Sequence, residues 1–289
     1  MKIFRGIKMV AGYMKNFFDM IYGLKLSYNT IMNGKRDVMD NEPEKKVLIM
    51  GNGPSLNSTD MEKLKSEVSD IACVNFFPLK DERFFALKPQ YLCLLDPVFF
   101  TKSENSMETK KNELLCILEK VDWPLKIICI QNNTLPIKNE KIKYCYLCKS
   151  AFVGKNIKRF RYFLYRNNLV NLGYQNVIIG AGFYFVSKQV KEIYLAGVDM
   201  SEFKLLEVDE DNDICVNTQH HYGNEKIKHS ELGVIKKGEF YKLLNCYVKM
   251  FEQFHYLEEY AVFQGVKIYN LSPNSFIDVF EKRQDFIKL

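Results

Sequence analysis

The sequence lacks the features that mark several large classes of protein. No uninterrupted apolar stretch reaches the roughly 18 to 20 residues that a membrane span requires, and the N-terminus has no compact apolar signal peptide. No glycine turn continues into a Walker phosphate loop or a complete dinucleotide fingerprint. With 289 residues and 47% hydrophobic content, the chain is long enough for a substantial core. We therefore expect a globular protein on the cytoplasmic side of the inner membrane.

The eight cysteines do not suggest a disulfide framework. Most lie in apolar runs such as Ile71-Ala-Cys-Val74, where a thiol behaves as a small hydrophobe in a reducing compartment. Cys145 and Cys148 have the spacing of a metal or redox pair, but no second pair or Cys/His motif accompanies them. We expect no metal site and no bound cofactor.

The positive charge is concentrated at the N-terminus. Residues 1–36 contain seven basic side chains and one acidic side chain, which accounts for the whole formal excess of +6. Within residues 9–32, apolar side chains recur in steps of three and four, which predicts an amphipathic helix with a basic polar face. This stripe consists of Val10, Met14, Phe17, Ile21, Leu24, Tyr28 and Ile31.

Such a helix has two interpretations that the pattern does not separate. It can lie on an anionic membrane surface as a peripheral anchor, or it can pack on its own domain or on a second subunit of a homo-oligomer. The polar residues 33–43 predict a linker, so that residues 1–44 form the helix and linker and residues 45–289 form the main domain.

From residue 45 onward, short apolar runs alternate with helical stretches. This alternation predicts an α/β, Rossmann-like domain with a mostly parallel sheet flanked by helices. The predicted strands are 47–50, 70–74, 91–95, 126–130, 142–147, 192–196 and 266–270. The predicted helices are 61–67, 109–120, 155–167, 183–190 and 237–264.

The sharpest local motif follows the first of these strands. Gly51-Asn52-Gly53-Pro54-Ser55 is a glycine-rich turn between a buried strand and a helix. Glycines there permit positive φ and close backbone approach, and Asn52 and Ser55 add polar side chains that suit a phosphate or a ribose. An ordinary tight turn is the alternative.

Two further strands end in polar residues, Asn75 and Asp96. Because ligands bind at the carboxyl ends of parallel strands, these side chains can join Asn52 around one ligand. Taken singly, each is more often a turn or capping residue. Asp199 closes the strand 192–196 after Gly197, where it can bind a ligand, orient a histidine or act as a structural cap.

Four segments together resemble the bacterial lipooligosaccharide sialyltransferase family. They are Gly51-Asn-Gly-Pro-Ser-Leu56, Val74-Asn75, Lys191-Glu-Ile-Tyr-Leu-Ala-Gly-Val-Asp199 and Ile268-Tyr-Asn-Leu-Ser-Pro-Asn-Ser275. The resemblance covers about residues 45–280 and extends to transferases of related nonulosonic acids. It implies a nucleotide-binding α/β domain with a lid-like insertion, near residues 200–236 in this chain. It also implies a CMP-sialic acid donor and no metal requirement.

The resemblance also implies roles for individual residues. Asn52 and Gly53 would contact the phosphate and ribose of CMP, and Asn75 would meet the cytidine or the sugar. Asp96 stands where the family usually has asparagine. The donor-binding set implied by position is Gly51, Asn52, Gly53, Ser55, Asn75, Asp96, Asp199, Pro273, Asn274 and Ser275.

Only four histidines are available as a catalytic base, a role that suits imidazole near neutral pH. The family motif aligns with His220-His221-Tyr222-Gly223, which makes His221 or His220 the base, with His229 as a third option. They follow the polar stretch Asp209–Gln219, which we expect to be a mobile loop. His255 is expected to be a packing residue.

The resemblance implies inverting transfer of sialic acid or a related nonulosonic acid from CMP to a sugar or lipid-linked glycan acceptor in surface-polysaccharide synthesis. The leaving CMP would be held by backbone amides of the glycine turn. The family's two leaving-group tyrosines are missing after Asp199, and Tyr222, Lys226 or Lys228 can replace them. The alternatives are transfer from another nucleotide sugar, a pterin diphosphokinase, or a non-catalytic nucleotide-binding scaffold.

Overall fold

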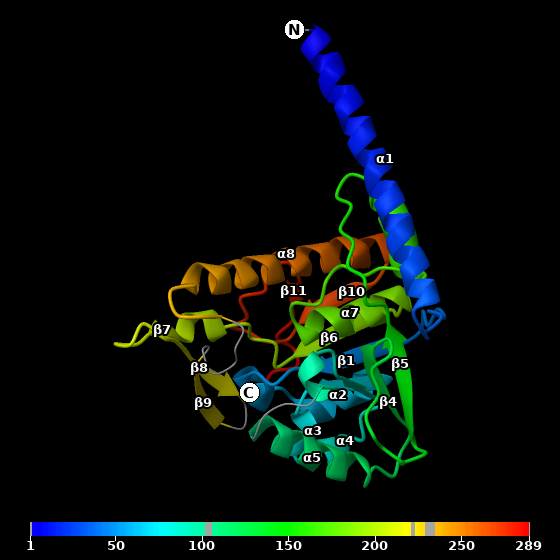
Figure 1. Cartoon of the computed structure of the whole chain (residues 1–289). Helices are drawn as coiled ribbons and strands as arrows, with labels where there is room; N and C mark the ends of the chain where they lie inside the picture. The colour runs from blue at the N-terminus through cyan, green and yellow to red at the C-terminus, as the bar shows by residue number, and fades with distance from the viewer. Residues whose placement is uncertain (1, 102–105, 221–222, 229–234, 289) are drawn as a thin grey trace.

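The structure of the chain is a computed structural model that describes residues 2–101, 106–220, 223–228 and 235–288 (Figure 1). Among these residues, eight parallel strands form one central sheet. They are β1 (Lys46–Met50), β2 (Asp70–Val74), β3 (Tyr91–Cys93), β4 (Leu125–Ile130), β5 (Ile142–Leu147), β6 (Glu192–Ala196), β10 (Lys267–Asn270) and β11 (Glu281–Lys282). Their spatial order is β11-β10-β6-β1-β2-β3-β4-β5. The predicted α/β class is confirmed.

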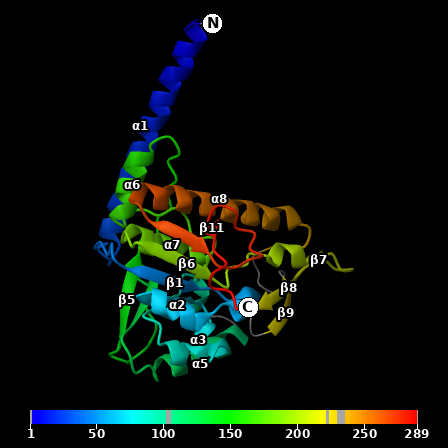
Figure 2. The same ribbon diagram turned by 180° about the vertical axis from the view of Figure 1, so that it is seen from behind.

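Helices cover both faces of this sheet (Figures 1 and 2). The α-helices are α1 (Lys2–Met32), α2 (Met61–Glu67), α3 (Phe77–Lys80), α4 (Arg83–Leu87), α5 (Ser106–Leu118), α6 (Lys158–Arg166), α7 (Val177–Ser187) and α8 (Phe240–Gln264). Short 3₁₀ helices are η1 (Pro54–Ser58), η2 (Pro97–Phe99) and η3 (Glu202–Leu205).

Strand β1 shows why both faces need a cover. Val47 and Ile49 point into a core shared with α7 and α8, whereas Leu48 and Met50 point into a core shared with α2, α4 and α5. A parallel strand buried on both faces is apolar throughout, as this one is from Val47 to Met50. The sheet is therefore the centre of a three-layer domain.

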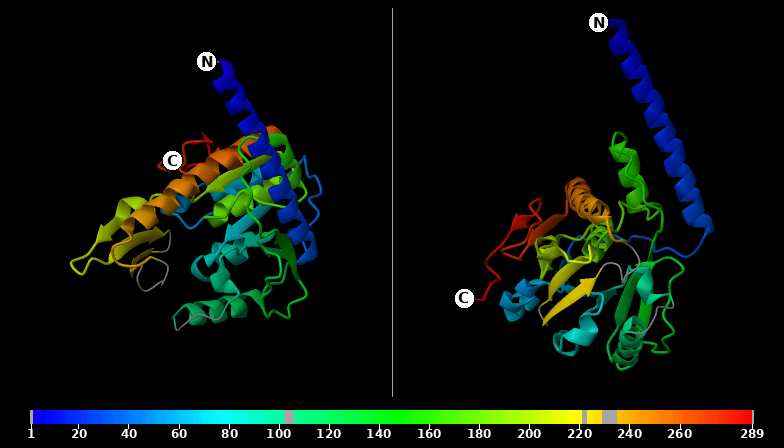
Figure 3. Two further views of the ribbon diagram at one scale, coloured as in Figure 1. Left: turned by 45° about the horizontal axis from the view of Figure 1, so that its top comes forward. Right: turned by 60° about the vertical axis from the view of Figure 1, so that its left-hand side comes forward.

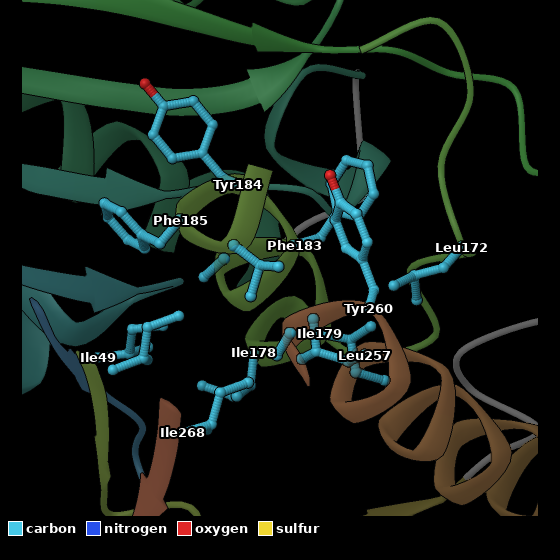
Figure 4. Close-up of a cluster of buried hydrophobic side chains, with 14 of the residues drawn as sticks. Ile49, Leu172, Ile178, Ile179, Phe183, Tyr184, Phe185, Leu257, Tyr260 and Ile268 are labelled. Atoms are coloured by element: carbon cyan, nitrogen blue, oxygen red, sulfur yellow. The ribbon is translucent and has the colours of Figure 1, made fainter. Parts of the chain in front are cut away.

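Helix α7 is the most buried helix of the domain. It begins at Val177, six residues before the predicted start at 183, and its residues from Ile178 to Ser187 are buried. The helix is apolar on all sides because the sheet covers one side and α8 the other. Its sequence therefore has no helical periodicity from which its start could be predicted. Figure 4 shows Phe183 and Ile179 beside Leu257 and Tyr260 of α8.

A second, smaller sheet corrects the expectation of a mobile loop at Asp209–Gln219. It consists of β7 (Leu206–Val208), β8 (Ile214–His220) and β9 (Gly223–Lys228), paired antiparallel. The acidic run Asp209–Asp213 is the tight β7–β8 turn, in which the Asp209 carboxylate accepts the amides of Asp211 and Asp213. Ile214 packs with Leu243 of α8, which holds this sheet at one end of that helix (Figure 1).

Helix α1 extends beyond the domain from the other end of α8 (Figures 1 and 3). Its buried face carries small side chains, Gly23, Ser27 and Thr30. A Cβ on Gly23 would lie 3.0 Å from Phe160 Cε1 of α6, so the two helices approach closely there. Within the described ranges, none of the helices combines the length and apolar character that a bilayer crossing requires.

The segment after α1 is docked on the domain. Asp37 and Tyr146 of the edge strand β5 exchange hydrogen bonds, because the Asp37 amide donates to the Tyr146 carbonyl and the Asp37 carboxylate accepts the Tyr146 amide. Asn168 donates to the Asp37 carbonyl, and Met39 is buried in the main core. The predicted linker therefore covers the exposed edge of β5.

The pair Cys145 and Cys148 lies inside the protein. Both thiols are buried, and burial raises the pKa of Cys145 to about 11 and that of Cys148 to about 12. The pKa of Cys129 is raised to about 12 for the same reason. Thiols in this state are protonated at neutral pH and therefore poor nucleophiles and metal ligands.

Alkylation of the native protein should follow this burial. We expect iodoacetamide to modify the exposed Cys116 first, because the thiols of Cys145 and Cys148 are shielded and protonated. Peptide mass spectrometry after brief labelling at pH 8 would measure the order. Equal labelling of Cys116 and Cys148 in the folded protein would contradict the burial, and labelling in urea provides the control.

Candidate functional site

The order in which the chain adds strands to the sheet reverses between β1 and β6. The chain passes from β1 through β2, β3 and β4 to β5 on one side, and then returns to place β6 on the other side of β1. Such a switch point leaves a crevice at the carboxyl ends of the two strands, where open α/β sheets bind ligands. Here the crevice is bordered by the turn 51–55 after β1 and the turn 197–200 after β6.

These two turns are in close contact, and the contact explains the glycines. A Cβ on Gly51 would lie 2.4 Å from the Gly197 carbonyl oxygen, and a Cβ on Gly53 would lie 2.2 Å from Asp199 Oδ2. Among the three, only Gly197 has a positive φ, of +67°. Of the two properties that glycine brings to this turn, positive φ and close backbone approach, Gly51 and Gly53 use the close approach, because a side chain has no room there.

Asp199 fastens the first turn to the second. Its carboxylate Oδ2 accepts the backbone amide of Ser55 at 3.0 Å, at the start of η1, and the residue is 7% exposed. An acceptor at this place satisfies an amide that the short helix leaves without a partner. The sequence left three roles open for Asp199, which were ligand binding, orientation of a histidine and structural capping. The hydrogen bond to the Ser55 amide is a structural role.

The loop after β10 forms hydrogen bonds with both of these turns. Ser272 Oγ accepts the amide of Val198 at 2.9 Å and the hydroxyl of Ser55 at 2.8 Å. Ser275 Oγ donates to the Val198 carbonyl at 2.7 Å. Phe276 donates its amide to the Asp199 carbonyl. Ser275 thus supports the β6 turn from a buried position.

Three backbone amides of the glycine turn, where the leaving CMP is expected to bind, have acceptors within the protein. The amide of Gly51 donates to the Ala196 carbonyl, that of Gly53 to the Gly197 carbonyl and that of Ser55 to Asp199. These three amides of the glycine turn are already engaged inside the protein. An anionic ligand at the turn would therefore bind through groups other than these three amides.

Two adjoining pockets open at this edge of the sheet, and Asp199 borders both. The first, which we call the amide pocket, has a volume of about 120 Å³. Its polar side chains are Asn52, Asn75, Asn176 and Glu202, besides Asp199. Its remaining lining residues are Gly51, Gly53, Val74, Val177, Ile178, Gly197, Val198 and Met200.

The amide pocket contains two residues in the left-handed region of backbone space. Asn75 has φ +52° and Met200 has φ +49°. Asparagine tolerates this conformation, whereas for methionine it costs about 1 to 2 kcal/mol. The side-chain oxygen Oδ1 of Asn75 is buried and, among the described residues, accepts no hydrogen bond. A ligand that donates a hydrogen bond would satisfy it.

The second pocket, which we call the lysine pocket, has a volume of about 430 Å³. Its polar side chains include Lys204 and Asn274, and its walls are Pro54, Ser55, Ser58, Asp199, Ser201, Leu205, Pro273 and Phe276. The Lys204 ammonium lies 4.6 Å from the centre of the Phe276 ring, and Phe203 of η3 packs edge-on against the same ring. A cation among hydroxyl and amide groups suits a phosphate or a carboxylate.

Most of the predicted donor-binding residues meet at these pockets. Gly51, Asn52, Gly53, Asn75, Asp199, Ser55, Pro273 and Asn274 line one pocket or both. Asp96 lines neither and is exposed, and its carboxylate accepts the Val98 amide at the start of η2. Asp96 is therefore placed as a cap.

The histidines are described only in part. The backbone of His220 ends β8 and pairs with Gly223 at the start of β9. The predicted base His221 and its neighbour Tyr222 lie outside the described residues, as does His229. His255 is exposed on α8, which contradicts its expected packing role.

Several lining residues, among them Asn176, Glu202 and Lys204, were missed by the sequence analysis. Asn176 caps α7, because its side chain accepts the amide of Ile178, and this helix directs its N-terminus at the amide pocket. The sequence signal for this cap was an asparagine directly before an apolar run. Because that run has no helical periodicity, the start of the helix was not recognised. Lys204 had no local signal, since an exposed lysine in a short 3₁₀ helix is common on any surface.

No family model matches the sequence, and no curated protein gives a significant match. Among solved structures, the MAf glycosyltransferase from Magnetospirillum magneticum AMB-1 aligns with a TM-score of 0.49 and 14% identity over 92% of this chain. This chain spans 38% of that enzyme's length.

Two further similar structures come from Campylobacter jejuni. The alpha-2,3-sialyltransferase in its apo form has a TM-score of 0.44 and 16% identity, covering 89% of this chain and 87% of its own. The sialyltransferase CstII in complex with cytidine-5'-monophosphate aligns with a TM-score of 0.41 and 18% identity, and the alignment covers 86% of each chain. All three TM-scores lie below 0.5, so these alignments assign no function to this chain.

The contact between the two turns should make Gly53 intolerant of any side chain. We expect Gly53→Ala to lower the stability by about 1 to 3 kcal/mol, because its Cβ would overlap Asp199 Oδ2. Gly12→Ala is the matched control, since a Cβ at Gly12 meets no atom within 4 Å. Urea unfolding followed by circular dichroism would measure both, and equal stability of Gly53→Ala and wild type would contradict the contact.

The capping role of Asp199 gives a separate expectation. Asp199→Ala leaves the Ser55 amide without its acceptor and should cost about 1 to 3 kcal/mol. Asp199→Asn keeps an acceptor oxygen in place and should cost less than about 1 kcal/mol. Thermal unfolding of the two variants tests this. If the asparagine variant is as unstable as the alanine variant, the carboxylate acts through something other than this hydrogen bond.

Proposed function

We propose that this chain is a glycosyltransferase that moves sialic acid or a related nonulosonic acid from a CMP donor to a glycan acceptor. One observation carries the proposal. Segments that resemble the sialyltransferase family, separated by up to about 220 residues in the chain, converge on the two pockets at the β1–β6 switch point. They contribute Asn52, Asn75, Asp199 and Asn274 to the pocket walls.

The chemistry of the two pockets suits the two parts of such a donor. The amide pocket offers the side-chain amides of three asparagines beside the carboxyl groups of Asp199 and Glu202. Such donors and acceptors match the hydrogen-bonding edges of a base, a ribose or a sugar. The lysine pocket offers the Lys204 ammonium and the side-chain amide of Asn274, which match an anion. Because the pockets share Asp199, one nucleotide sugar can extend across both.

The reaction requires a base, and the family resemblance assigns it to the motif that begins at His220. His221 takes the proton of the acceptor hydroxyl while that oxygen attacks the anomeric carbon. The bond between the anomeric carbon and the phosphate oxygen breaks, and its electron pair leaves with CMP. A single displacement of this kind inverts the configuration at the anomeric carbon.

Lys204 is the residue that we assign to the departing phosphate. The family's tyrosines are absent here, and of the lysines considered in their place, Lys228 is paired with Asp209 at 3.0 Å. Lys204 instead faces the lysine pocket over Phe276 and, among the described residues, makes no ion pair with a carboxylate. A preorganised cation stabilises the charge that develops on a leaving phosphate.

Nucleotide binding gives the first test. We expect CMP to raise the thermal midpoint by several degrees at saturating concentration, while UDP, GDP and ATP have little effect, because binding to the folded state stabilises it. Lys204→Gln should weaken CMP about tenfold to a hundredfold through loss of a charge-assisted contact. Lys267→Gln is the matched control, an exposed lysine at the amino end of β10 on the opposite edge of the sheet.

Turnover separates the proposal from its alternatives. Wild-type protein should release CMP from CMP-sialic acid or a related CMP-sugar, and His221→Ala should lose this activity while still binding CMP. Preference for another nucleotide would favour a different sugar donor or a pterin diphosphokinase. Binding of CMP with no turnover of any CMP-sugar would favour a non-catalytic scaffold and would contradict the proposed transfer.

A further inference from the structure

Helix α1 presents a large apolar surface that its own domain does not cover. The domain packs against the small residues of the opposite face, Gly23, Ser27 and Thr30, where the Gln131 side chain also donates to the Thr30 carbonyl. The outer side chains are 40% to 67% exposed. This outer arc consists of Val10, Tyr13, Met14, Phe17, Phe18, Met20, Ile21, Tyr22, Leu24, Tyr28, Ile31 and Met32.

The position of the arc removes one interpretation of the apolar stripe. All seven stripe residues belong to the outer arc, so the stripe does not pack on this chain's own domain. A contiguous apolar surface of this size on an otherwise soluble fold marks an interaction site. A membrane surface and a second copy of the helix remain as occupants.

The width of the arc argues against a second copy. A two-helix seam buries a stripe of alternating three- and four-residue steps and surrounds it with charged pairs. Here the residues outside the stripe are also large and apolar, including Tyr13, Phe18 and Tyr22. A second helix would leave these uncovered, whereas a bilayer interface can accommodate the whole arc.

The charges of the segment favour lipid as well. The only acidic side chain in residues 1–36 is Asp19, which is partly buried on the domain side. Lys15 and Lys25 are exposed and would meet like charges, with no acidic partner, in a bundle of identical helices. Next to anionic headgroups the same lysines are attracted.

We propose that α1 lies in the headgroup region of an anionic bilayer, with the outer arc buried in its apolar layer and the domain held in water on the opposite face of the helix. Five exposed aromatic rings in the arc suit this depth, because Tyr and Phe place an apolar body in lipid near the interface. The small sheet beside the lysine pocket and α1 lie at opposite ends of α8 (Figures 1 and 2). The proposal therefore does not depend on the proposed transferase activity.

Vesicle co-sedimentation of the full chain tests this surface. We expect binding to phosphatidylcholine vesicles that contain phosphatidylglycerol, and much weaker binding to phosphatidylcholine alone or at high salt. Phe17→Glu with Leu24→Glu should weaken binding at least tenfold, because two exposed apolar side chains that the proposal inserts into the bilayer become charged. Lys15→Gln and Lys25→Gln should each weaken it about fivefold.

Val248→Glu is the matched control, an apolar side chain that is 64% exposed on α8. It should bind vesicles like wild type, and circular dichroism should show that all variants are folded. Wild-type protein that ignores anionic vesicles would overturn the proposal. So would an oligomer in vesicle-free solution, seen by light scattering, that Phe17→Glu with Leu24→Glu converts to monomers, because the arc would then bind a second copy.

Discussion

The close approach of two turns at the centre of the sheet determines the shape of the candidate site. The turn after β1 lies so near the turn after β6 that Gly51 and Gly53 have no room for a side chain. Asp199 then joins the turns through the amide of Ser55, and Ser272 and Ser275 attach the loop after β10 to the same point. Three segments that are distant in sequence are thereby joined by hydrogen bonds at the candidate site.

Side chains next to these joined turns line the two pockets. Because the amides of Gly51, Gly53 and Ser55 are used to hold the turns together, they do not form a phosphate cradle. Lys204 of η3 lines the lysine pocket, where its ammonium lies over the ring of Phe276. Asn75 lines the amide pocket from the end of β2, where its backbone is in the left-handed conformation. The amide pocket and the lysine pocket thus adjoin each other and share Asp199 in their walls.

The N-terminal helix follows a different logic from the rest of the chain. Most apolar side chains of the domain are buried between the sheet and its helices, as in the cluster around Phe183 and Tyr260 (Figure 4). In α1 the order is reversed, since Gly23 and Ser27 pack inward and Phe17 and Leu24 point outward. The helix is attached to the domain through its least apolar face, which leaves its most apolar face available for an external partner.

Local pattern alone determined much of this architecture. Strands such as Asp70–Val74 and Glu192–Ala196 agree with their predicted bounds, because buried parallel strands are short apolar runs between polar turns. The partly exposed edge strand Ile142–Leu147 also agrees with its predicted bounds. The convergence of Asn52 and Asn75 also followed from the sequence, since parallel strands share one carboxyl edge.

Tertiary structure decided what local pattern cannot encode. Gly53 is glycine because a side chain there would overlap Asp199, which is 146 residues away in the chain. The sequence around Gly53 does not reveal this neighbour. The early start of α7 and the strands β7 to β9 arise because α8 supplies the apolar surface that buries them. The direction of the α1 stripe likewise required the position of α6, because a periodic pattern defines a face of a helix but not what that face meets.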